Sequence, residues 1–363
     1  MTDVRLMTSE FSKDTVENGL EYRLLERIMM PPDLVERLRT GVVAQVDAPV
    51  LQAITGKNML PLGPSCRGSF RVGYTFFEDN ILAASDIQNA REHFDIIVAG
   101  SSWCEQVLRD NGLEMVTTVI QGIDPQVFNP AHADKQMFRD HFVVFSGGKF
   151  EFRKGQDIVI RAFKVLQDRH RDVLLVSSWY NQWPWSMQTM ASSPHIEFST
   201  SSTSSDFDLL ITETLHANGI DLNRVIVLPP RPNSTMAKLI KNTDVGLFPN
   251  RCEGGTNLVL MEYMASGKPV IASHCTGHKD VIDESNARTI EKMGIVNVVR
   301  ENGDLVAQWP DPDLDETIAQ LEWSYQNRDE LKKLGVKAGN DLAQRTWRNS
   351  AQDFLRIIDN ATA

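Results

Sequence analysis

The sequence predicts an α/β protein with two domains, each built on a parallel sheet that helices cover on both faces. Three observations support this fold class. The chain has 363 residues, which is enough for two domains with a large core. Short apolar runs bounded by loop residues alternate with helix-like segments, a pattern typical of buried parallel strands. Two glycine-containing loops each follow a predicted strand and precede a predicted helix.

Composition excludes several classes of protein. The hydrophobic fraction of 42% and the charged fraction of 23% are those of a soluble globular protein. The chain has 37 basic and 48 acidic side chains, and the resulting net charge of -11 argues against nucleic acid as a general partner. It has no apolar run long enough to span a membrane and no signal peptide pattern. Its four scattered cysteines fit a reducing compartment, so we expect a cytoplasmic protein.

Residues 1–130 are predicted to form the first domain. Its expected strands are Val4–Met7, Val42–Val46, Val50–Ile54, Arg71–Phe76, Phe94–Ala99 and Val116–Ile120. Helix-like residues 20–39 carry four arginines that as many acids cancel, so a solvated surface is favoured over contact with a membrane surface. Loops at the carboxyl ends of parallel strands form binding sites, and Glu78, Ser101 and Ser102 occupy such loops.

Residues 136–345 are predicted to form the second domain, after a linker with two prolines. Its expected strands are Phe142–Phe145, Val173–Ser177, Val225–Leu228, Val245–Phe248 and Val270–Ala272. Residues 314–363 are predicted to be helical. The last helix, from about residue 346, has an apolar face that has to dock on another surface, and the first domain is the candidate.

The first glycine loop joins the strand that begins at Phe142 to a helix predicted over residues 156–168. It starts at Gly148 and contains three cations, Lys149, Arg153 and Lys154. The helix dipole does not favour cations at a helix N-terminus, so their placement makes more sense if they share an anion. A solvated basic loop without a ligand is the alternative.

The second glycine loop opens the segment Asn250–Ser273, which predicts a turn, a helix and a buried strand. The turn and helix-start residues are Glu253, Gly254, Gly255, Thr256, Asn257 and Leu258, with Thr256 or Asn257 as the cap. Adjacent glycines allow close approach of a ligand, and the helix N-terminus directs free N–H groups at it. A site that binds phosphate with backbone amides, and hydroxyls with the carboxylates of Glu253 and Glu262, suits a nucleotide sugar. A plain turn with a solvated glutamate is the alternative.

Two further clusters are interpreted as structural. A strand end is followed by three tryptophans within seven residues, Trp179, Trp183 and Trp185. They could stack on a base or a sugar, but packing against the domain core is the favoured interpretation. The cluster formed by His274, Cys275 and His278 matches no standard zinc spacing, so no metal site is expected.

From about residue 70 to residue 360, the chain resembles the GT-B glycosyltransferases of retaining family 4 (glycosyl transferases group 1), which includes sucrose synthase. In that family a Gly-Arg loop followed by Lys-Gly binds the donor pyrophosphate. Here Gly148-Lys149 and Lys154-Gly155 stand at the same interval, with Lys in place of Arg. The family's two glutamates that flank a glycine turn correspond to Glu253 and Glu262, followed by Tyr-Met-Ala-Ser-Gly-Lys-Pro-Val.

The resemblance implies two Rossmann-like domains whose parallel sheets face a central cleft. It implies that Glu262 holds the ribose, while Glu253 and the amides of residues 254–258 hold the transferred sugar and the phosphates. Lys149, Arg153 and Lys154 would stabilise charge on the leaving diphosphate, with no metal or other cofactor. The implied reaction transfers a sugar from a nucleotide diphosphate sugar to an acceptor hydroxyl with retention, in polysaccharide, glycolipid or glycoconjugate synthesis. The acceptor would be a glycan, a lipid-linked molecule or a protein.

Two departures from the family pattern matter. The family usually places its glutamates eight positions apart, whereas Glu253 and Glu262 are nine apart. Where many members carry an acceptor-side histidine, this chain has Glu78, which joins Glu253 and Lys154 as a candidate catalytic residue. The altered spacing leaves a non-catalytic sugar-nucleotide or glycan-binding protein on the same fold as the alternative.

Overall fold

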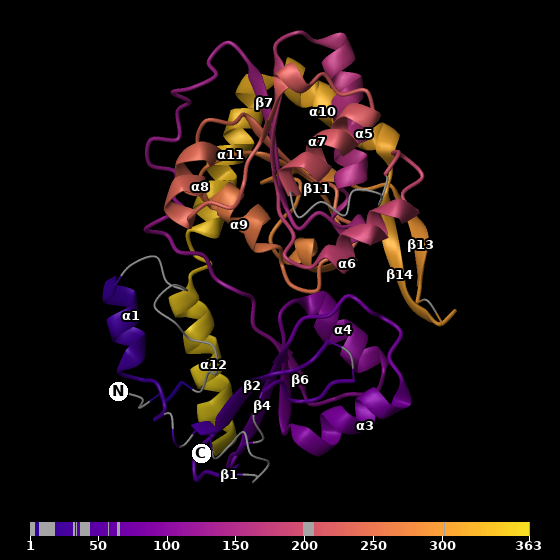
Figure 1. Ribbon diagram of the computed structural model, residues 1–363. Coiled ribbons are helices and arrows are strands. Elements are labelled where there is room, and N and C mark those ends of the chain that lie inside the picture. The colour runs from indigo at the N-terminus through magenta and orange to yellow at the C-terminus, as the bar shows by residue number, and fades with distance from the viewer. Residues whose placement is uncertain are drawn as a thin grey trace.

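The structure is a computed structural model that describes residues 4–6, 19–31, 33, 35–36, 44–56, 58–63, 66–198, 207–300 and 302–362. These residues form two α/β lobes, one above the other in Figure 1. The chain passes from the first lobe to the second after β6 and returns to the first at its C-terminal helix (Figure 1). No helix in the described ranges is both long and apolar enough to cross a membrane.

The first lobe holds a four-stranded parallel sheet in the order β2-β4-β5-β6. Its strands are β2 (Val50–Ala53), β4 (Arg71–Thr75), β5 (Ile96–Ala99) and β6 (Val116–Thr118). Helices α3 (Ala84–His93) and α4 (Ser102–Asp110) cover one face. The other face is covered by α12 (Trp347–Thr362), which packs Phe354, Ile357 and Ile358 against Val72 and Val98. The apolar face of the last helix therefore lies on the first sheet.

The second lobe holds a six-stranded parallel sheet in the order β12-β11-β10-β7-β8-β9. Its strands are β7 (Phe142–Gly148), β8 (Val173–Trp179), β9 (Val225–Val227), β10 (Val245–Phe248), β11 (Val270–Ser273) and β12 (Arg288–Ile290). One face packs on α5 (Gln156–Arg169), α7 (Phe207–Ala217) and α10 (Leu314–Gln326). The other face packs on α8 (Asn233–Ile240), α9 (Leu258–Ala265) and α11 (Arg328–Leu342). Strands buried on both faces explain why their sequences are continuous apolar runs.

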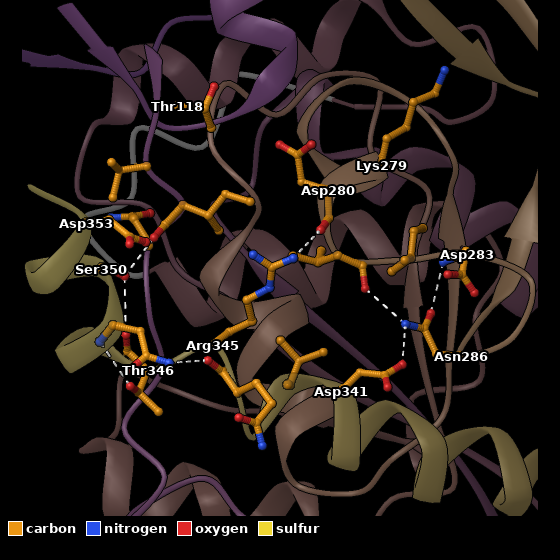
Figure 2. Close-up of a pocket in the computed structure, with 18 of the residues that line it drawn as sticks. Thr118, Lys279, Asp280, Asp283, Asn286, Asp341, Arg345, Thr346, Ser350 and Asp353 are labelled. Carbon is orange, nitrogen blue, oxygen red and sulfur yellow. Dashed lines mark hydrogen bonds between the residues drawn. The ribbon is translucent and has the colours of Figure 1, made fainter. Parts of the chain in front are cut away.

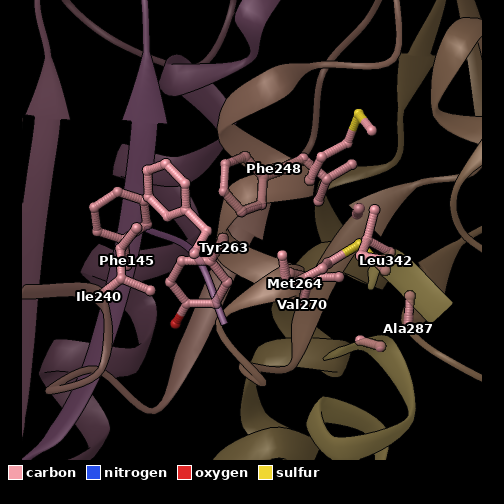
Figure 3. Packing of buried hydrophobic residues seen from close by; sticks show 14 of the residues in the cluster. Phe145, Ile240, Phe248, Tyr263, Met264, Val270, Ala287 and Leu342 are labelled. Atoms are coloured by element: carbon pink, nitrogen blue, oxygen red, sulfur yellow. The ribbon is translucent and has the colours of Figure 1, made fainter. Parts of the chain in front are cut away.

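The core beneath α9 fixes the helix that carries Glu262. Figure 3 shows Phe145 of β7, Phe248 of β10 and Tyr263 of α9 packed together. The rings of Phe145 and Tyr263 stack with centroids 5.1 Å apart, and the Tyr263 hydroxyl lies 2.6 Å from Thr243 Oγ1. Because aromatic packing and a buried hydrogen bond hold Tyr263, the position of its neighbour Glu262 is set by the core.

An antiparallel hairpin extends from the second lobe toward the first. It consists of β13 (Met293–Val299) and β14 (Leu305–Pro312) and reaches downward beside the gap between the lobes in Figure 1. Gln308 accepts and donates hydrogen bonds with Asn80, at 3.1 and 2.9 Å, and Arg300 pairs with Asp79 at 2.6 Å. The sequence patterns did not predict this hairpin.

The predicted α/β class with parallel sheets is confirmed. The first two predicted strands of the N-terminal region are not found at their predicted lengths. In place of the first strand, Leu6 forms an isolated bridge with Met29, and Met7 lies outside the described residues. The second strand is reduced to β1 (Ala44–Gln45), which pairs with β3 (Cys66–Arg67), and residues 42 and 43 are outside the described ranges.

The helix-like segment 20–39 forms one regular helix, α1 (Gly19–Glu26). A turn follows, and residues 33, 35 and 36 are again helical, while residues 37–39 are outside the described part of the chain. Helix α1 ends at Glu26, before Pro31. The remaining elements are α6 (Pro184–Met187) and short 3₁₀ turns at Phe152–Lys154, Gln188–Ser192, Leu222–Arg224 and Thr276–Asp280.

Candidate active site

The two glycine loops meet at a buried ion pair. Lys154 Nζ lies 2.6 Å from Glu253 Oε1, and Arg153 Nη1 lies 3.3 Å from Glu253 Oε2. The backbone also joins the loops, because Arg251 N donates to Arg153 O at 2.8 Å. Gly155 makes this approach possible: its φ is +71°, and a Cβ there would lie 2.1 Å from Pro249 O. Only glycine fits this position without a shift of the backbone.

The environment of Glu253 keeps its carboxylate ionised. Burial would raise its pKa, but the charges of Lys154 and Arg153 outweigh burial and lower the pKa to about 2. Asn250 Nδ2 donates to the same carboxylate, and Glu253 N donates to Thr276 Oγ1 at 3.0 Å. The anion that these cations share in this structure is therefore a protein carboxylate.

Arg153 connects this pair to the first lobe. Its guanidinium is 3.3 Å from Glu78, which follows β4, and 2.5 Å from Glu151. Burial opposes its charge, but Glu78, Glu253 and Glu151 raise its pKa well above the ordinary value. Arg153 thereby brings two candidate catalytic residues, Glu78 and Glu253, to one guanidinium.

Glu78 is held by its backbone as well as by its side chain. Trp309 Nε1 of the hairpin donates to Glu78 O at 2.8 Å. The adjacent loop is fixed by Ile81 N, which donates to Val306 O at 3.0 Å. The hairpin of the second lobe therefore positions the loop of the first lobe that carries Glu78.

The glycine turn lies against the first lobe. Ser101 Oγ donates to Gly254 O at 2.7 Å, and a Cβ on Gly254 would lie 2.3 Å from Phe77 O. A Cβ on Gly255 would lie 3.0 Å from the Phe76 ring. The expected role of Gly254 was to leave room for a ligand. In the structure, the absence of its side chain instead makes room for the Phe77 backbone.

The start of α9 settles which residue caps it. Asn257 is the N-cap, with φ +60°, and its side chain accepts from Leu260 N at 3.4 Å. Its amide also lies 3.1 Å from His278 Nε2. Thr256 is buried and its hydroxyl faces Met261 Sδ instead, while Leu258, the first helical residue, is half-buried. Burial lowers the pKa of His278 to about 4, so it supports the cap as a neutral ring.

Glu262 stands apart from this network. It lies on α9 and is partly exposed, and burial raises the pKa of its carboxyl to about 7. Within the described ranges, no side chain or backbone group forms a hydrogen bond or ion pair with that carboxyl. A partly buried carboxyl without a partner is a group that can accept hydrogen bonds from a ligand.

Gly148 and Lys149 form the other end of the first loop. Gly148 ends β7 with φ +124°, and its Cβ position would be 3.8 Å from the Lys154 side chain. Lys149 does not join the ion pair. Its ammonium lies 4.1 Å from the centroid of the Trp183 ring, and burial lowers its pKa.

Sequence reasoning missed the ion pair beneath the loops. Arg251 is fully buried, and two of its nitrogens each lie 2.8 Å from an oxygen of Asp157 on α5. Its Nε lies 2.7 Å from Asp311 on β14, and the guanidinium lies 3.7 Å over the Phe152 ring. The sequence gives one signal for Arg251, its position two residues before Glu253. Its partners Asp157 and Asp311 are 94 and 60 residues away along the chain, so spacing does not reveal them.

A second contact between the lobes lies next to a cavity. Ser102 N and Oγ donate to the Asp280 carboxylate at 2.7 and 2.5 Å. The cavity, of about 900 Å³, is bounded by β6, the turn Thr276–Asp280 and the start of α12 (Figure 2). Arg345 points across it toward Asp280 in Figure 2. Its lining includes none of Lys154, Glu253 and Glu262, so it is separate from the loop pair. The described residues contain no group of three His, Cys, Asp or Glu side chains placed to hold a metal ion.

Comparison with known proteins agrees with this architecture. Residues 140–308 match the family of glycosyl transferases group 1. HepE of Anabaena, solved in complex with UDP and glucose, is similar with a TM-score of 0.59 and 15% identity over 80% of this chain and 72% of that one. Sucrose-phosphate synthase from Thermosynechococcus elongatus is similar with a TM-score of 0.60 and 16% identity over 82% and 69%.

A third similar structure is the α,α-trehalose 6-phosphate synthase of Burkholderia multivorans, with a TM-score of 0.55 and 14% identity over 82% of this chain and 68% of that one. No curated protein matches the sequence. At such identities the structures establish a shared fold, and the family match covers the lobe that holds both glycine loops. The chain therefore has the GT-B fold of these similar structures, and its residues 140–308, which carry both glycine loops, match glycosyl transferases group 1.

Proposed function

We propose that this enzyme transfers a sugar from a nucleotide diphosphate sugar to an acceptor hydroxyl with retention of the anomeric configuration. The observation that carries the proposal is the contact of Lys154 with Glu253, because it joins the two loops that the resemblance assigns to the donor. The unpartnered carboxyl of Glu262 adds a group suited to ribose hydroxyls. The similar HepE of Anabaena was solved with UDP and glucose, which agrees with a nucleotide-sugar donor.

The donor diphosphate takes the place of one carboxylate contact in this proposal. Without donor, Lys154 and Arg153 neutralise Glu253. When the diphosphate binds, Lys154 has donors for both the phosphate and Glu253, because an ammonium carries three. Lys149, Lys154 and the amides at the start of α9 then face the charge that grows on the leaving group. Glu253 keeps oxygens to accept from hydroxyls of the transferred sugar.

The chemical step breaks the bond between the anomeric carbon and the diphosphate oxygen and forms a bond to the acceptor oxygen. The acceptor hydroxyl gives its proton to the departing phosphate on the same face of the sugar. Glu78 faces this step from the first lobe, since it is fixed by Arg153 and Trp309. We assign Glu78 the role of orienting the acceptor, and Glu253 and Lys154 contact the donor.

We also propose that the reaction needs no metal. Fixed cations and helix amides supply the positive charge that a metal would otherwise bring to the diphosphate. Treatment with EDTA is therefore expected to leave the transfer rate unchanged. The acceptor belongs to polysaccharide, glycolipid or glycoconjugate synthesis in the cytoplasm, and a lipid-linked acceptor would bring the enzyme to a membrane surface.

A panel of nucleotide diphosphate sugars tests the proposal. Release of nucleoside diphosphate from one donor, followed by NMR of the product's anomeric proton, identifies the donor and the stereochemistry. Retention with one or a few donors supports the proposal. Inversion contradicts the assigned stereochemistry, and no release from any donor contradicts the transferase reaction.

A further inference from the structure

Large aromatic side chains are exposed on the loop that follows β8, which we call the aromatic loop (residues 180–187). The exposed fractions are 45% for Tyr180, 39% for Trp183 and 72% for Trp185. Trp179, directly before the loop, is buried and stacks on Phe150 with centroids 5.7 Å apart. The predicted packing of the tryptophans on the core therefore holds for Trp179 only. Clustered exposed rings on a folded protein mark a binding surface more often than isolated ones.

The aromatic loop is held in place by a buried polar side chain. Asn181 is only 4% exposed, and its amide donates to Phe150 O at 3.2 Å and to Ser186 Oγ at 2.6 Å. Its carbonyl oxygen accepts from Trp183 N at 2.9 Å. The hydrogen bonds of Asn181 thus order the loop that carries the rings, which lowers the entropy that a ligand would have to overcome.

Hydrogen bonds also connect the aromatic loop and the turn after it to the first glycine loop. Phe150 O belongs to the first glycine loop, and Phe152 N of that loop donates to Thr189 Oγ1 at 3.1 Å. The Lys149 ammonium covers the Trp183 ring. Helix α6, which begins directly after Trp183, lies at the edge of the second lobe that faces the first lobe (Figure 1). Trp183 therefore lies beside the first glycine loop.

The aromatic loop and Glu262 lie on opposite faces of the second sheet. Trp179 and Phe150 belong to the core formed with α5 and α7, and Tyr180 packs edge-on against Phe207 of α7. Glu262 is on α9, which packs on the other face. If Glu262 holds the ribose, the nucleoside is directed away from the exposed tryptophans. A nucleobase is therefore a poor candidate for the rings.

We propose that Tyr180, Trp183 and Trp185 form a binding platform for sugar rings of a glycan acceptor. A sugar presents an apolar face of C–H groups that suits an aromatic ring, and hydroxyl edges that suit the Gln182 amide between the rings. A membrane surface is less suitable, because it favours rings flanked by several cations. Lys149 is the one cation that contacts the described aromatic loop, and the chain carries a net charge of -11.

That the bound glycan is an acceptor rests on the proposed function, but glycan binding itself can be measured without any transfer. Wild type, Trp185→Ala and Trp347→Ala are to be labelled and applied to a glycan array. Trp347 is the control, since it is also an exposed tryptophan (47%) but lies on α12, outside the aromatic loop. Wild type and Trp347→Ala are expected to retain the same glycans, and Trp185→Ala to bind them about tenfold more weakly or not at all.

Retention of no glycan by wild type, or equal retention by Trp185→Ala, would overturn the platform. Wild type and Trp185→Ala are also to be sedimented with phosphatidylcholine–phosphatidylglycerol vesicles. If wild type binds no glycan but sediments with the vesicles, and Trp185→Ala does not sediment, the rings bind membranes instead. Slow hydrolysis of the donor without acceptor, measured in parallel, separates the two proposals. Its absence from wild type speaks against the transferase reaction, whereas the array result decides the platform.

Discussion

The ammonium of Lys154 lies 2.6 Å from the carboxylate of Glu253, although 99 residues separate them along the chain. This contact brings the loop after β7 and the loop after β10 to one point at the carboxyl edge of the second sheet. Because Glu253 is buried, the pair is desolvated and its charges interact strongly. A diphosphate that binds here must compete with this carboxylate for the Lys154 ammonium, or share that ammonium with it.

Replacement of Lys154 tests whether its charge is used in catalysis. Lys154→Ala is expected to lower kcat/KM for the donor by about 100-fold or more, because a fixed charge is lost beside the leaving group. Arg153 still neutralises Glu253 and Asn250 still donates a hydrogen bond to it, so the variant should remain folded by circular dichroism. Lys164→Ala removes a lysine that pairs with Asp168 on α5 and serves as the control, with unchanged kinetics. Equal activity of the two variants would refute a catalytic role for Lys154.

The raised pKa of Glu262 predicts how stability depends on pH. Burial raises this pKa from 4.5 to about 7, so the folded protein binds the proton more tightly than the unfolded chain. Ionisation therefore opposes folding: its cost is absent below pH 4.5, grows between pH 4.5 and about 7, and is constant above that. Glu262→Gln is expected to have a higher Tm than wild type at about pH 8, with the difference vanishing toward pH 4.5.

The control for this effect is Glu330→Gln, because Glu330 is exposed on α11 and pairs with Lys333 at the surface. Its Tm should follow that of wild type at both pH values. Differential scanning fluorimetry in matched buffers makes the measurement. A Tm difference between Glu262→Gln and wild type that is the same at both pH values would show that Glu262 is not protonated by burial.

The buried pair beneath the loops predicts a large loss of stability. Arg251→Met leaves Asp157 buried without its partner, and the midpoint of urea unfolding should fall by an amount that corresponds to about 3–5 kcal/mol. Lys333→Met removes an exposed partner of Glu330, and its unfolding midpoint should stay close to that of wild type. Similar midpoints for the two variants would mean that Arg251 is not a structural anchor of the site.

The close contact at Gly254 predicts that adding one methyl group at this position pushes the two lobes apart. A Cβ at this position would lie 2.3 Å from Phe77 O and 2.7 Å from Phe77 N, and neither is a flexible side-chain end. Gly254→Ala is therefore expected to enlarge the radius of gyration in small-angle scattering and to lower transfer. In Gly294→Ala the nearest atoms would be 3.6 Å away, so this control should match wild type. An unchanged scattering curve for Gly254→Ala would show that the lobes meet differently.

The sequence predicts most of the second lobe because its strands are buried on both faces. β7 begins with the apolar run Phe142–Phe145, β10 is the buried segment Val-Gly-Leu-Phe, and a glycine loop lies at the carboxyl end of each. The short N-terminal runs lack this property. β1 consists of two residues, and Leu6 makes an isolated bridge, so their apolar residues carry little information on strand length.

The interlobe contacts depend on groups that are distant in sequence and could not be predicted from spacing. The hairpin β13–β14 has apolar residues such as Ile295 and Val299 that face solvent, so its pattern does not separate a buried face from an exposed one. Its role becomes visible only when Trp309 reaches Glu78. The packing of Phe77 against Gly254 likewise needs both lobes in place, so the sequence alone predicts a ligand in the space that the Phe77 backbone occupies.

The most direct test of the shared donor site is calorimetric titration with a panel of nucleoside diphosphates. Wild type is expected to bind at least one of them, Lys154→Ala to bind it at least about tenfold more weakly, and Lys164→Ala to bind it as wild type does. Failure of every nucleoside diphosphate to bind wild type, or identical affinities for wild type and Lys154→Ala, would contradict the claim that the two loops hold a diphosphate together.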